Sequence, residues 1–528
     1  MTKKRTKPIP VIDIFAGPGG LGEGFSSYKA KDCSIPFQVG LSIECDKFAH
    51  ETLLLRKFFK KLVENGKSAN YYSFLRNDIS KEKLFAYHKE EYDRSKEEAY
   101  LATLGKTPEG DIDKKIKKVL NKNKDWILIG GPPCKAFSVV ARSRRGGIDP
   151  SDPNVNLYLE YLKILHKFSP SVFILENVRG LLSSKVNNKN MFDEIVSHLK
   201  SPANILEGQK RISKKSRSRS HRYRIVSLVE KPEKKNLFSP TEYEPSDFLI
   251  HCEKYGIPQA RPRVILMGIR ENIHGEPLQL KPGKHINVIQ ALDDLPKLRS
   301  GLSKGSDSCE LWKTALKKGR AMPWFHELKK KDILVYDLVD RVLNNPSRPS
   351  NNRGAEFISV EKNIALGNHP FFNWVKDKKV FGVCNHSTRG HITNDIYRYV
   401  FASCFSEIYK KSPKLNDFPK SLLPKHQNIK EAIKGGMFSD RFRVQLKDKP
   451  STTITSHISK DGHYYIHYDP SQCRSLTVRE AARLQTFPDN YFFCGPRTSQ
   501  YTQVGNAVPP FLANQIAEIV FKLLNRQV

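Results

Sequence analysis

The sequence lacks long apolar runs, and this absence bears first on the class of protein. Hydrophobic residues make up 38% of the 528 residues, and the mean hydropathy is negative. No window approaches the ~18 consecutive apolar residues of a membrane-spanning helix. The basic start "MTKKRTKPIPVIDIF" runs into a strand-like segment without the apolar core of a signal peptide. We therefore expect a cytoplasmic protein that has no membrane partner.

Cysteine is also scarce and is not arranged in pairs. The nine cysteines are an odd number, and no CxxC pair occurs. This pattern suits a reducing cytoplasm better than a disulfide framework. The segment "CNHSTRGH" contains Cys384, His386 and His391, but a second pair of ligands is missing, so we expect no metal site.

Acidic residues are few relative to basic ones. The chain has 55 Asp and Glu against 89 Lys and Arg, which gives a formal net charge of +34. A solvated surface does not require such an imbalance, whereas a polyanionic partner does, because Lys and Arg release counterions from phosphates. Nucleic acid is the leading partner, and a basic protein that is merely soluble is the alternative. Basic clusters lie at 114–124, 138–145 and 209–224, the last of which is equally typical of a solvated loop.

Short β-branched runs alternate with helical patterns in the first half of the chain. This alternation predicts an α/β fold with a doubly wound, mostly parallel sheet, whose ligands bind at the carboxyl ends of the strands. The pattern dissolves between about 285 and 445, where we expect an irregular domain, and helices return near the C-terminus. The expected strands are 10–15, 37–44, 125–131, 171–178, 222–229 and 263–270; the expected helices include 47–59, 156–168, 475–487 and 509–525.

A glycine-rich turn follows the first expected strand. In "VIDIFAGPGGLGEGF", Gly17, Gly19 and Gly20 let the backbone approach a ligand closely, although ordinary tight turns share this feature. The next strand ends in "SIECD" and places Glu44 where a carboxylate can bind ribose hydroxyls. A third strand is expected to end at "RNDIS", with Asp78 beside the same crevice. Since no GxxxxGK[ST] pattern is present, the crevice suits an adenosine-bearing cofactor rather than a triphosphate.

Two further strand ends carry reactive side chains. "GGPPC" ends one strand with Cys134, and "ENV" ends the next with Glu176. In a parallel sheet both side chains open on one edge and can converge. Taken singly, Cys134 could be a small buried hydrophobe and Glu176 a helix cap.

The motifs, taken in order, resemble those of a known family. "DIFAGPGG", "GGPPCKAFS", "ENVRG", "YGIPQARPRVILMGIR", "RSLTVREAARLQTFPD" and "QYTQVGNAVPP" follow the order and approximate spacing of the DNA (cytosine-5)-methyltransferases of bacterial restriction-modification systems. The resemblance covers about 11–270 and 450–528. It implies the S-adenosylmethionine-dependent methyltransferase fold, with a catalytic domain at 1–284, a target-recognition domain at 285–455, and C-terminal motifs at 456–528 that complete the catalytic domain.

The resemblance also assigns catalytic roles. Carbon 5 of cytosine is a poor nucleophile, and a thiolate that adds to carbon 6 converts the ring to an enamine that can accept a methyl group. Cys134 matches this nucleophile. Glu176 matches the glutamate that hydrogen-bonds ring nitrogen 3 and the exocyclic amine, and Arg263 matches the arginine beside the cytosine carbonyl. Gln259 and Arg261 are expected to be scaffold.

The cofactor implied is S-adenosylmethionine. Glu44 is expected to hold the ribose and Asp78 the adenine amine. The closing "GNAVPP" is expected beside the glycine-rich turn, so the two ends of the chain would build one pocket. The other residues expected to line the pocket are Phe15, Gly17, Gly19, Gly20, Leu21, Pro132, Leu157, Asn506 and Val508.

The family resemblance implies duplex DNA as the substrate and a target cytosine that is flipped out of the stack. The segment after Cys134 contains the helix breakers Gly146, Gly147 and Pro150, and fits a loop that closes over the flipped base; a static basic loop is the alternative. Lys135 departs from the glutamine usual in the family. The residues expected to contact DNA are Lys135, Ser138, Arg142, Arg144 and Arg145.

Two other functions stay open at this point. One is a catalytically idle DNA-binding module, which the intact Cys134 and Glu176 argue against; the other is a tRNA cytosine methyltransferase with the same chemistry. We expect a monomer that acts with a separately encoded restriction endonuclease of the same specificity.

Overall fold

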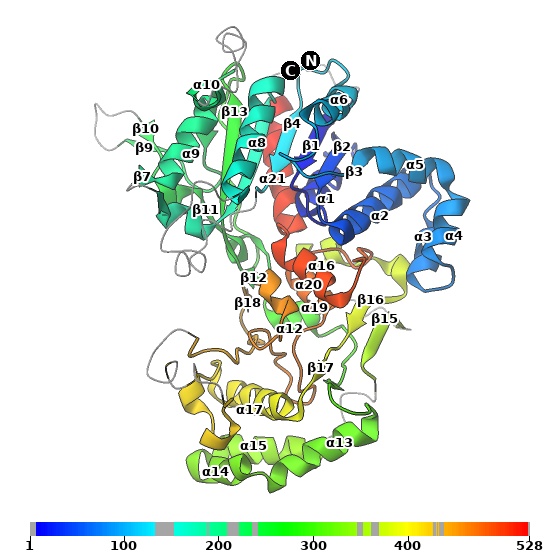
Figure 1. Ribbon diagram of the computed structural model, residues 1–528, viewed down its shortest axis with the longest axis vertical. Helices are drawn as coiled ribbons and strands as arrows, with labels where there is room; N and C mark the ends of the chain where they lie inside the picture. The colour runs from blue at the N-terminus through cyan, green and yellow to red at the C-terminus, as the bar shows by residue number, and fades with distance from the viewer. Residues whose placement is uncertain are drawn as a thin grey trace.

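A central sheet and a lower helical lobe make up the molecule. The computed structural model describes residues 7–132, 153–186, 189–208, 221–234, 241–345, 352–360, 369–425 and 438–525, together with residues 429 and 431. Figure 1 shows the sheet with its covering helices in the larger upper part and the lobe below it.

The central sheet has the strand order β11-β13-β5-β4-β1-β2-β3, and β8 pairs with β13. The strands β3, β2, β1, β4 and β5 run parallel, while β13 is antiparallel to β5, β8 and β11. The order reverses between β1 and β4, and ligands of such sheets bind outside the strand ends at this point. The strands are β1 (Ile9–Ile14), β2 (Phe37–Glu44), β3 (Ala99–Leu101), β4 (Ile127–Gly130), β5 (Val172–Val178), β8 (Tyr223–Val226), β11 (Leu249–His251) and β13 (Pro262–Arg270).

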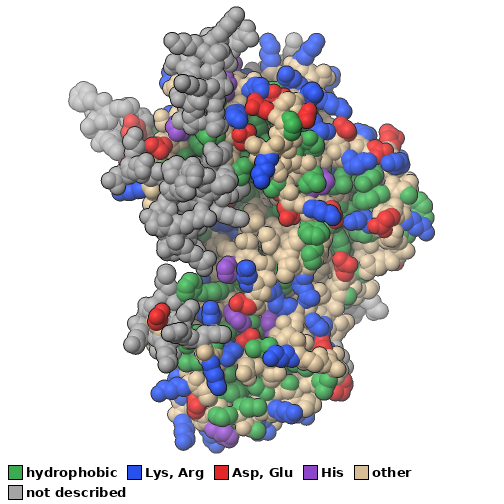
Figure 2. Space-filling model, in the orientation of Figure 1, with side chains coloured by type: hydrophobic (Ala, Val, Ile, Leu, Met, Phe, Trp, Pro, Cys, Tyr) green, Lys and Arg blue, Asp and Glu red, His purple; other side chains and the backbone are tan. Residues whose placement is uncertain are grey.

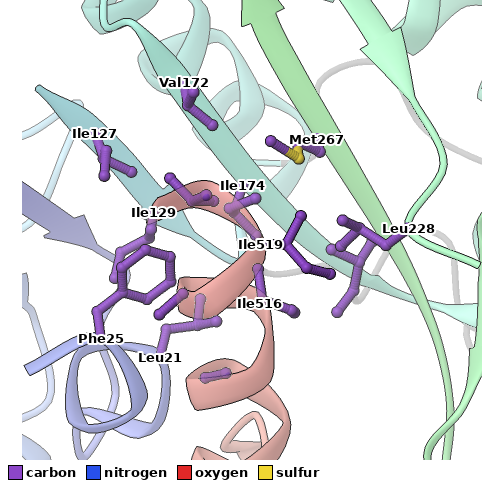
Figure 3. Packing of buried hydrophobic residues seen from close by; sticks show 14 of the residues in the cluster. Leu21, Phe25, Ile127, Ile129, Val172, Ile174, Leu228, Met267, Ile516 and Ile519 are labelled. Carbon is purple, nitrogen blue, oxygen red and sulfur yellow. The ribbon is translucent and has the colours of Figure 1, made fainter. Parts of the chain in front are cut away.

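Both faces of the sheet are covered, which confirms the doubly wound α/β fold. In β4, Ile127 and Ile129 belong to the cluster around α1 and α21, whereas Leu128 belongs to the cluster around α6 and α8. Figure 3 shows the first cluster, in which side chains of α21 pack against the strands. Burial on both faces explains why β1 and β4 are continuous apolar runs. The helices are α1 (Gly20–Ser26), α2 (Lys47–Glu64), α6 (Glu109–Leu120), α8 (Pro153–Phe168) and α21 (Pro510–Asn525).

The C-terminal helix folds back onto the N-terminal part, as the sequence predicted. A methyl group on Gly24 of α1 would lie 2.3 Å from the Cβ of Ala513, so the two helices pack backbone to backbone. Asn514 Nδ2 also donates a hydrogen bond to the Gly24 carbonyl, over 2.9 Å.

One stretch of the described chain, Arg497–Asn525, is long and apolar enough to cross a membrane by length and composition alone. It comprises α20 (Arg497–Asn506) and α21, and 67% of its apolar window is buried inside the protein. Leu512, Ile516 and Ile519 pack in the cluster beneath the sheet. The apolar character of this stretch is therefore that of a core helix.

The third strand is not where the sequence placed it. The segment "RNDIS" follows α3 (Ala69–Leu75) and precedes α4 (Lys81–Tyr87), and the third parallel strand is β3, which comes after α5 (Lys89–Glu98). In α3, Tyr71, Tyr72, Phe74 and Leu75 are buried, a spacing that favours a helix. Figure 1 shows α3 and α4 at the outer margin of the upper part.

The lower lobe is helical, so the predicted irregular domain is wrong for this part of the chain. Val335, Val339 and Leu343 recur every fourth residue, and all are fully buried in the core of the lobe. This helical spacing was present in "ILVYDLVDRVLN", but the abundance of polar residues around it concealed it. We call α13 (Cys309–Lys318), α14 (Pro323–Lys331), α15 (Ile333–Asn344) and α17 (Thr393–Tyr409) the helical lobe.

The hydrophobic clusters do not stop at the expected domain borders. Ile466 and Cys473, which follow residue 455, pack in the core of the helical lobe. Val288 of α12 (Val288–Leu292) shares a different cluster with Leu476. The division at 284 and 455 stays a prediction.

Candidate active site

The glycine-rich turn follows the carboxyl end of β1. Three of its residues have a left-handed backbone conformation: Phe15 (φ 55°), Gly17 (φ 57°) and Gly19 (φ 97°). Gly19 is the N-cap of α1, and its conformation disfavours any residue with a side chain. A methyl group on Gly20 would lie 2.3 Å from the Val508 carbonyl oxygen. The turn and the "GNAVPP" segment are therefore in backbone contact, as predicted.

Glu44 fastens this turn to the end of β2. Its carboxylate is 9% exposed and accepts hydrogen bonds from three backbone N–H groups, those of Gly17 (2.7 Å), Cys45 (2.9 Å) and Asp46 (2.8 Å). By contrast, no described atom lies within 4 Å of the position that a Cβ of Gly17 would take. Glu44 therefore fixes the backbone of the turn through the Gly17 N–H, while the space that a Gly17 side chain would occupy is free of described atoms.

Asn506 and Val508 are positioned by buried polar side chains around the end of α20. Arg261 Nη2 donates to the carbonyls of Gly505 and Ala507, both over 2.9 Å, and Gln485 Nε2 donates to that of Ala507 over 2.5 Å. Burial, aided by the charge of the neighbouring Arg263, lowers the pKa of Arg261 to about 9. Asn506 is exposed at this end of the helix. Its backbone neighbours are therefore fixed while its side chain faces solvent.

Gln259 extends the same network, which agrees with the scaffold role expected for Gln259 and Arg261. Gln259 Nε2 donates to Gln485 Oε1 over 2.6 Å, and its Oε1 accepts from the Ile454 N–H over 2.8 Å. Both Gln259 and Arg261 are almost completely buried. The network joins the start of β13 to the C-terminal motifs.

Glu176 and Arg263 form an ion pair at the edge of the sheet. Arg263 Nε lies 2.9 Å from Glu176 Oε1, and the two side chains are 10% and 13% exposed. Because β13 runs antiparallel to β5, the start of β13 meets the end of β5, and Arg263 pairs with Val178. A methyl group on Gly131 would lie 2.8 Å from Glu176 Oε2. The backbone after β4 therefore passes directly against the Glu176 carboxylate.

The other residues expected at the site differ in where the structure places them. Pro132 is buried next to Gly131, and Leu157 is half-buried on α8. Asp78 does not follow a strand: it is exposed between α3 and α4 and pairs with Arg76 over 3.1 Å. Asp78 was expected to bind the adenine amine because a strand was expected to end beside it, and the structure has helices on both sides of it instead. The residues that lie outside the described part of the chain are Cys134, Lys135, Ser138, Arg142, Arg144 and Arg145.

No group of three or more His, Cys, Asp or Glu side chains that could hold a metal ion occurs among the described residues. His386 uses both ring nitrogens elsewhere, 2.8 Å from Thr477 Oγ1 and 2.8 Å from the Pro296 carbonyl oxygen. Burial lowers the pKa of His386 to about 4, so the ring is neutral. Its place in "CNHSTRGH" is structural.

The sequence reading missed two residues beneath the glycine-rich turn. Asp13 of β1 is fully buried, and its carboxylate oxygens have no hydrogen-bond partner among the described residues. Burial raises the pKa of Asp13 to about 7, against the opposing effect of the Lys57 charge. The buried Tyr491 hydroxyl donates to the Pro18 carbonyl. An acidic residue inside the apolar "PVIDIF" was a signal for Asp13; nothing in the sequence marked Tyr491.

Comparison with known proteins identifies relatives along almost the whole chain. A model of the family "C-5 cytosine-specific DNA methylase" matches residues 75–202 and 229–522. The Type II methyltransferase M.Bpa9945I of Bacillus paralicheniformis is 28% identical over 98% of this chain and 99% of its own length. The Type II methyltransferase M.DdeI of Desulfomicrobium norvegicum is 23% identical over 96% of this chain and 87% of its own. The solved structure of Entamoeba histolytica methyltransferase EhMeth aligns with a TM-score of 0.42 and 14% identity, over 98% and 99% of the two chains.

Proposed function

Because the chain belongs to the C-5 cytosine-specific DNA methylase family, it is a DNA (cytosine-5)-methyltransferase, and we propose that it is the modification enzyme of a type II restriction-modification system. Full-length relatives named as type II methyltransferases support this role. The proposal includes a separately encoded restriction endonuclease that acts on the same site, a monomeric state and a cytoplasmic location.

The observation that carries the catalytic part is the Glu176–Arg263 pair against the backbone of Gly131. In this proposal Cys134, which follows Gly131 by three residues, is the nucleophile: its thiolate adds to carbon 6 of cytosine, and the 5,6 double bond opens to place its electron pair on carbon 5. Loss of the carbon-5 proton after methylation restores the double bond and expels the thiolate. Glu176 hydrogen-bonds ring nitrogen 3 and the exocyclic amine, and so favours the protonated ring as the bond forms. Arg263 fixes the Glu176 carboxylate and lies beside the cytosine carbonyl.

The use of S-adenosylmethionine is a general property of this family, and the residues at the end of β1 fit such a cofactor. The space at Gly17 is open, Glu44 holds the Gly17 N–H, and Gly20 of the same turn contacts the Val508 backbone, at the point where the strand order reverses. When bound, the cofactor supplies an electrophilic methyl group. The residues proposed to hold it are Phe15, Gly17, Gly19, Gly20, Leu21, Glu44, Pro132, Leu157, Asn506 and Val508.

Duplex DNA is the proposed substrate, with the target cytosine flipped out of the stack because Cys134 cannot reach a stacked base. The net charge of +34 supports contacts to many phosphates. Figure 2 shows Lys, Arg and His side chains, with Asp and Glu among them, in the region where the upper part meets the helical lobe. Lys135, Ser138, Arg142, Arg144 and Arg145 are proposed as further contacts from the segment after Cys134.

Incubation with labelled S-adenosylmethionine and either duplex DNA or tRNA tests the function. We expect label in duplex DNA alone, at one cytosine of a defined sequence as located by bisulfite sequencing. Cys134→Ala should abolish the transfer and retain DNA binding. Label in tRNA instead of DNA would establish the tRNA alternative, and binding to DNA without transfer by the wild-type protein would establish the idle module.

A further inference from the structure

In the short extended run Arg443–Gln445, the Arg443 side chain is partly exposed, whereas Val444 and Gln445 are buried. The run is hydrogen-bonded to the chain around Ile466: the Arg443 N–H donates to the His463 carbonyl over 2.9 Å, and the Ile466 N–H donates to the Arg443 carbonyl over 3.0 Å. Val444 is buried in the core of the helical lobe. Since successive side chains of an extended chain alternate, Arg443 and Gln445 share the opposite face.

Gln445, which is fully buried, links this run to the strand pair that precedes β13. Gln445 Oε1 accepts a hydrogen bond from the Thr452 N–H over 2.8 Å. Thr452 belongs to β18 (Ser451–Thr452), which pairs with β12 (Gln259–Ala260), and Ala260 precedes Arg263 by three residues. Arg443 precedes Gln445 by two residues, which is about 6.8 Å along an extended chain. Arg443 is therefore close in the chain to a residue that is hydrogen-bonded to the strand pair preceding Arg263.

The Arg443 guanidinium is supported from two directions. It forms an ion pair with Asp440, and its central carbon lies 5.7 Å from the centre of the Tyr464 ring. The side chain is nevertheless 34% exposed. A carboxylate on one edge and an aromatic face limit the rotation of the planar group while part of it faces solvent. A flexible phosphate contact does not need such support, whereas recognition of a base edge requires a fixed fork.

We propose that Arg443 is a specificity-determining residue that donates two hydrogen bonds to O6 and N7 of a guanine in the major groove of the recognised DNA. A guanine edge is the base pattern that an arginine fork matches. Asp440 orients Arg443 and does not itself contact DNA. The inference rests on the proposed methylation of duplex DNA and adds the identity of one base pair in its recognition site.

The test uses the full-length protein and a library of duplexes in which every position around the methylated cytosine is randomised. Methylation is read by bisulfite sequencing for the wild type and for Arg443→Ala. We expect the variant to lose about 10- to 100-fold of its discrimination at one G·C pair, with the preferences at other positions retained. The KM for S-adenosylmethionine should be unchanged.

Two further variants separate base recognition from charge. Arg443→Lys keeps the charge and loses the planar fork, so it should also relax the same position. Arg320→Ala is the matched control, because Arg320 is an exposed arginine paired with Asp340 over 2.7 Å in the helical lobe, before α14. It should leave every preference unchanged.

The outcomes are distinct. Unchanged preferences at every position in an active Arg443→Ala protein would overturn the inference, as would an equal loss for all sequences that Arg443→Lys restores, which is the result expected of a phosphate contact. If Arg443→Ala does not fold, Asp440→Asn should still weaken discrimination at the same single position, and its failure to do so would also overturn it. No methylation of duplex DNA by the wild type would refute the proposed function itself.

Discussion

At the scale of single residues, the site depends on how two carboxylates are surrounded. Glu176 is paired with Arg263 across 2.9 Å and stays close to solvent at the strand ends. Asp13 lies on β1, which is two strands from β5 in the sheet, is fully buried and has no hydrogen-bond partner among the described residues. The Glu176 carboxylate therefore has a cationic partner beside it, whereas burial raises the pKa of the Asp13 carboxyl to about 7.

Replacement of the Glu176 carboxylate should affect chemistry more than binding. Glu176→Gln keeps the size of the side chain but removes the charge that favours a protonated cytosine ring. We expect kcat to fall by about 10²- to 10⁴-fold, the range typical of general acid–base groups, with little change in thermal stability. Glu518→Gln, at a glutamate on the surface of α21 that pairs with Lys522, is the control. A kcat within twofold of the wild type would contradict the role of Glu176.

Asp13 should make stability depend on pH in a particular direction. Its pKa is raised in the folded state, so between about pH 4 and pH 7 the folded protein binds more protons than the unfolded chain, and the free energy of unfolding falls as pH rises. Asp13→Asn removes this effect. Relative to the wild type, the variant should gain stability from pH 4.5 to pH 7, by at most about 4 kcal/mol. Urea unfolding at several pH values measures the difference, and a constant difference across this range would argue against a neutral Asp13.

At the scale of elements, close backbone contacts bring the two ends of the chain together at the proposed cofactor pocket. Gly20 and Gly24 of α1 face Val508 and Ala513 with no room for a Cβ on either glycine. This contact places the "GNAVPP" backbone against the glycine-rich turn. Glycine is needed here for space as well as for conformation.

Gly20→Ala should therefore damage both stability and cofactor binding. Its methyl group would lie 2.3 Å from a backbone carbonyl oxygen, and backbone cannot move aside as a side chain can. We expect a loss of about 1–3 kcal/mol or more in the free energy of unfolding, and weaker binding of S-adenosylmethionine by calorimetry. Gly110→Ala is the matched control, because nothing lies within 4 Å of its Cβ position in α6. It should be stabilising by about 0.5–1 kcal/mol. Equal behaviour of the two variants would refute the packing argument.

At the scale of the whole molecule, charge and architecture act together. The net charge of +34 is carried by a protein whose face shown in Figure 2 has Lys and Arg side chains over both the upper part and the helical lobe, with Asp and Glu among them. Such a distribution attracts a polyanion over distances longer than any single contact.

DNA affinity should fall steeply with salt. If six to ten phosphates are contacted, the affinity for duplex DNA should drop by about 10³- to 10⁵-fold between 50 and 200 mM salt. Fluorescence anisotropy with a labelled duplex measures the slope. Binding of S-adenosylmethionine, measured over the same range, should change little. A flat salt dependence for DNA would show that the excess charge does not serve phosphate binding.

The sequence by itself predicted most of the main strands, the glycine-rich turn, and Glu44 and Glu176 at their strand ends, because these depend on local patterns of burial, turn residues and spacing. The role expected of Arg263 came from the resemblance of its motif. Prediction from the sequence failed at "RNDIS", where a strand was expected and helices occur, and at "ILVYDLVDRVLN", where polar neighbours hid a helical repeat. Only the tertiary structure decided that Arg263 meets Glu176, that Arg261 and Gln485 hold the end of α20, and that Asp13 lies unpaired beneath the turn. These contacts join residues that are far apart in the chain, and no local preference specifies which distant backbone a side chain will meet.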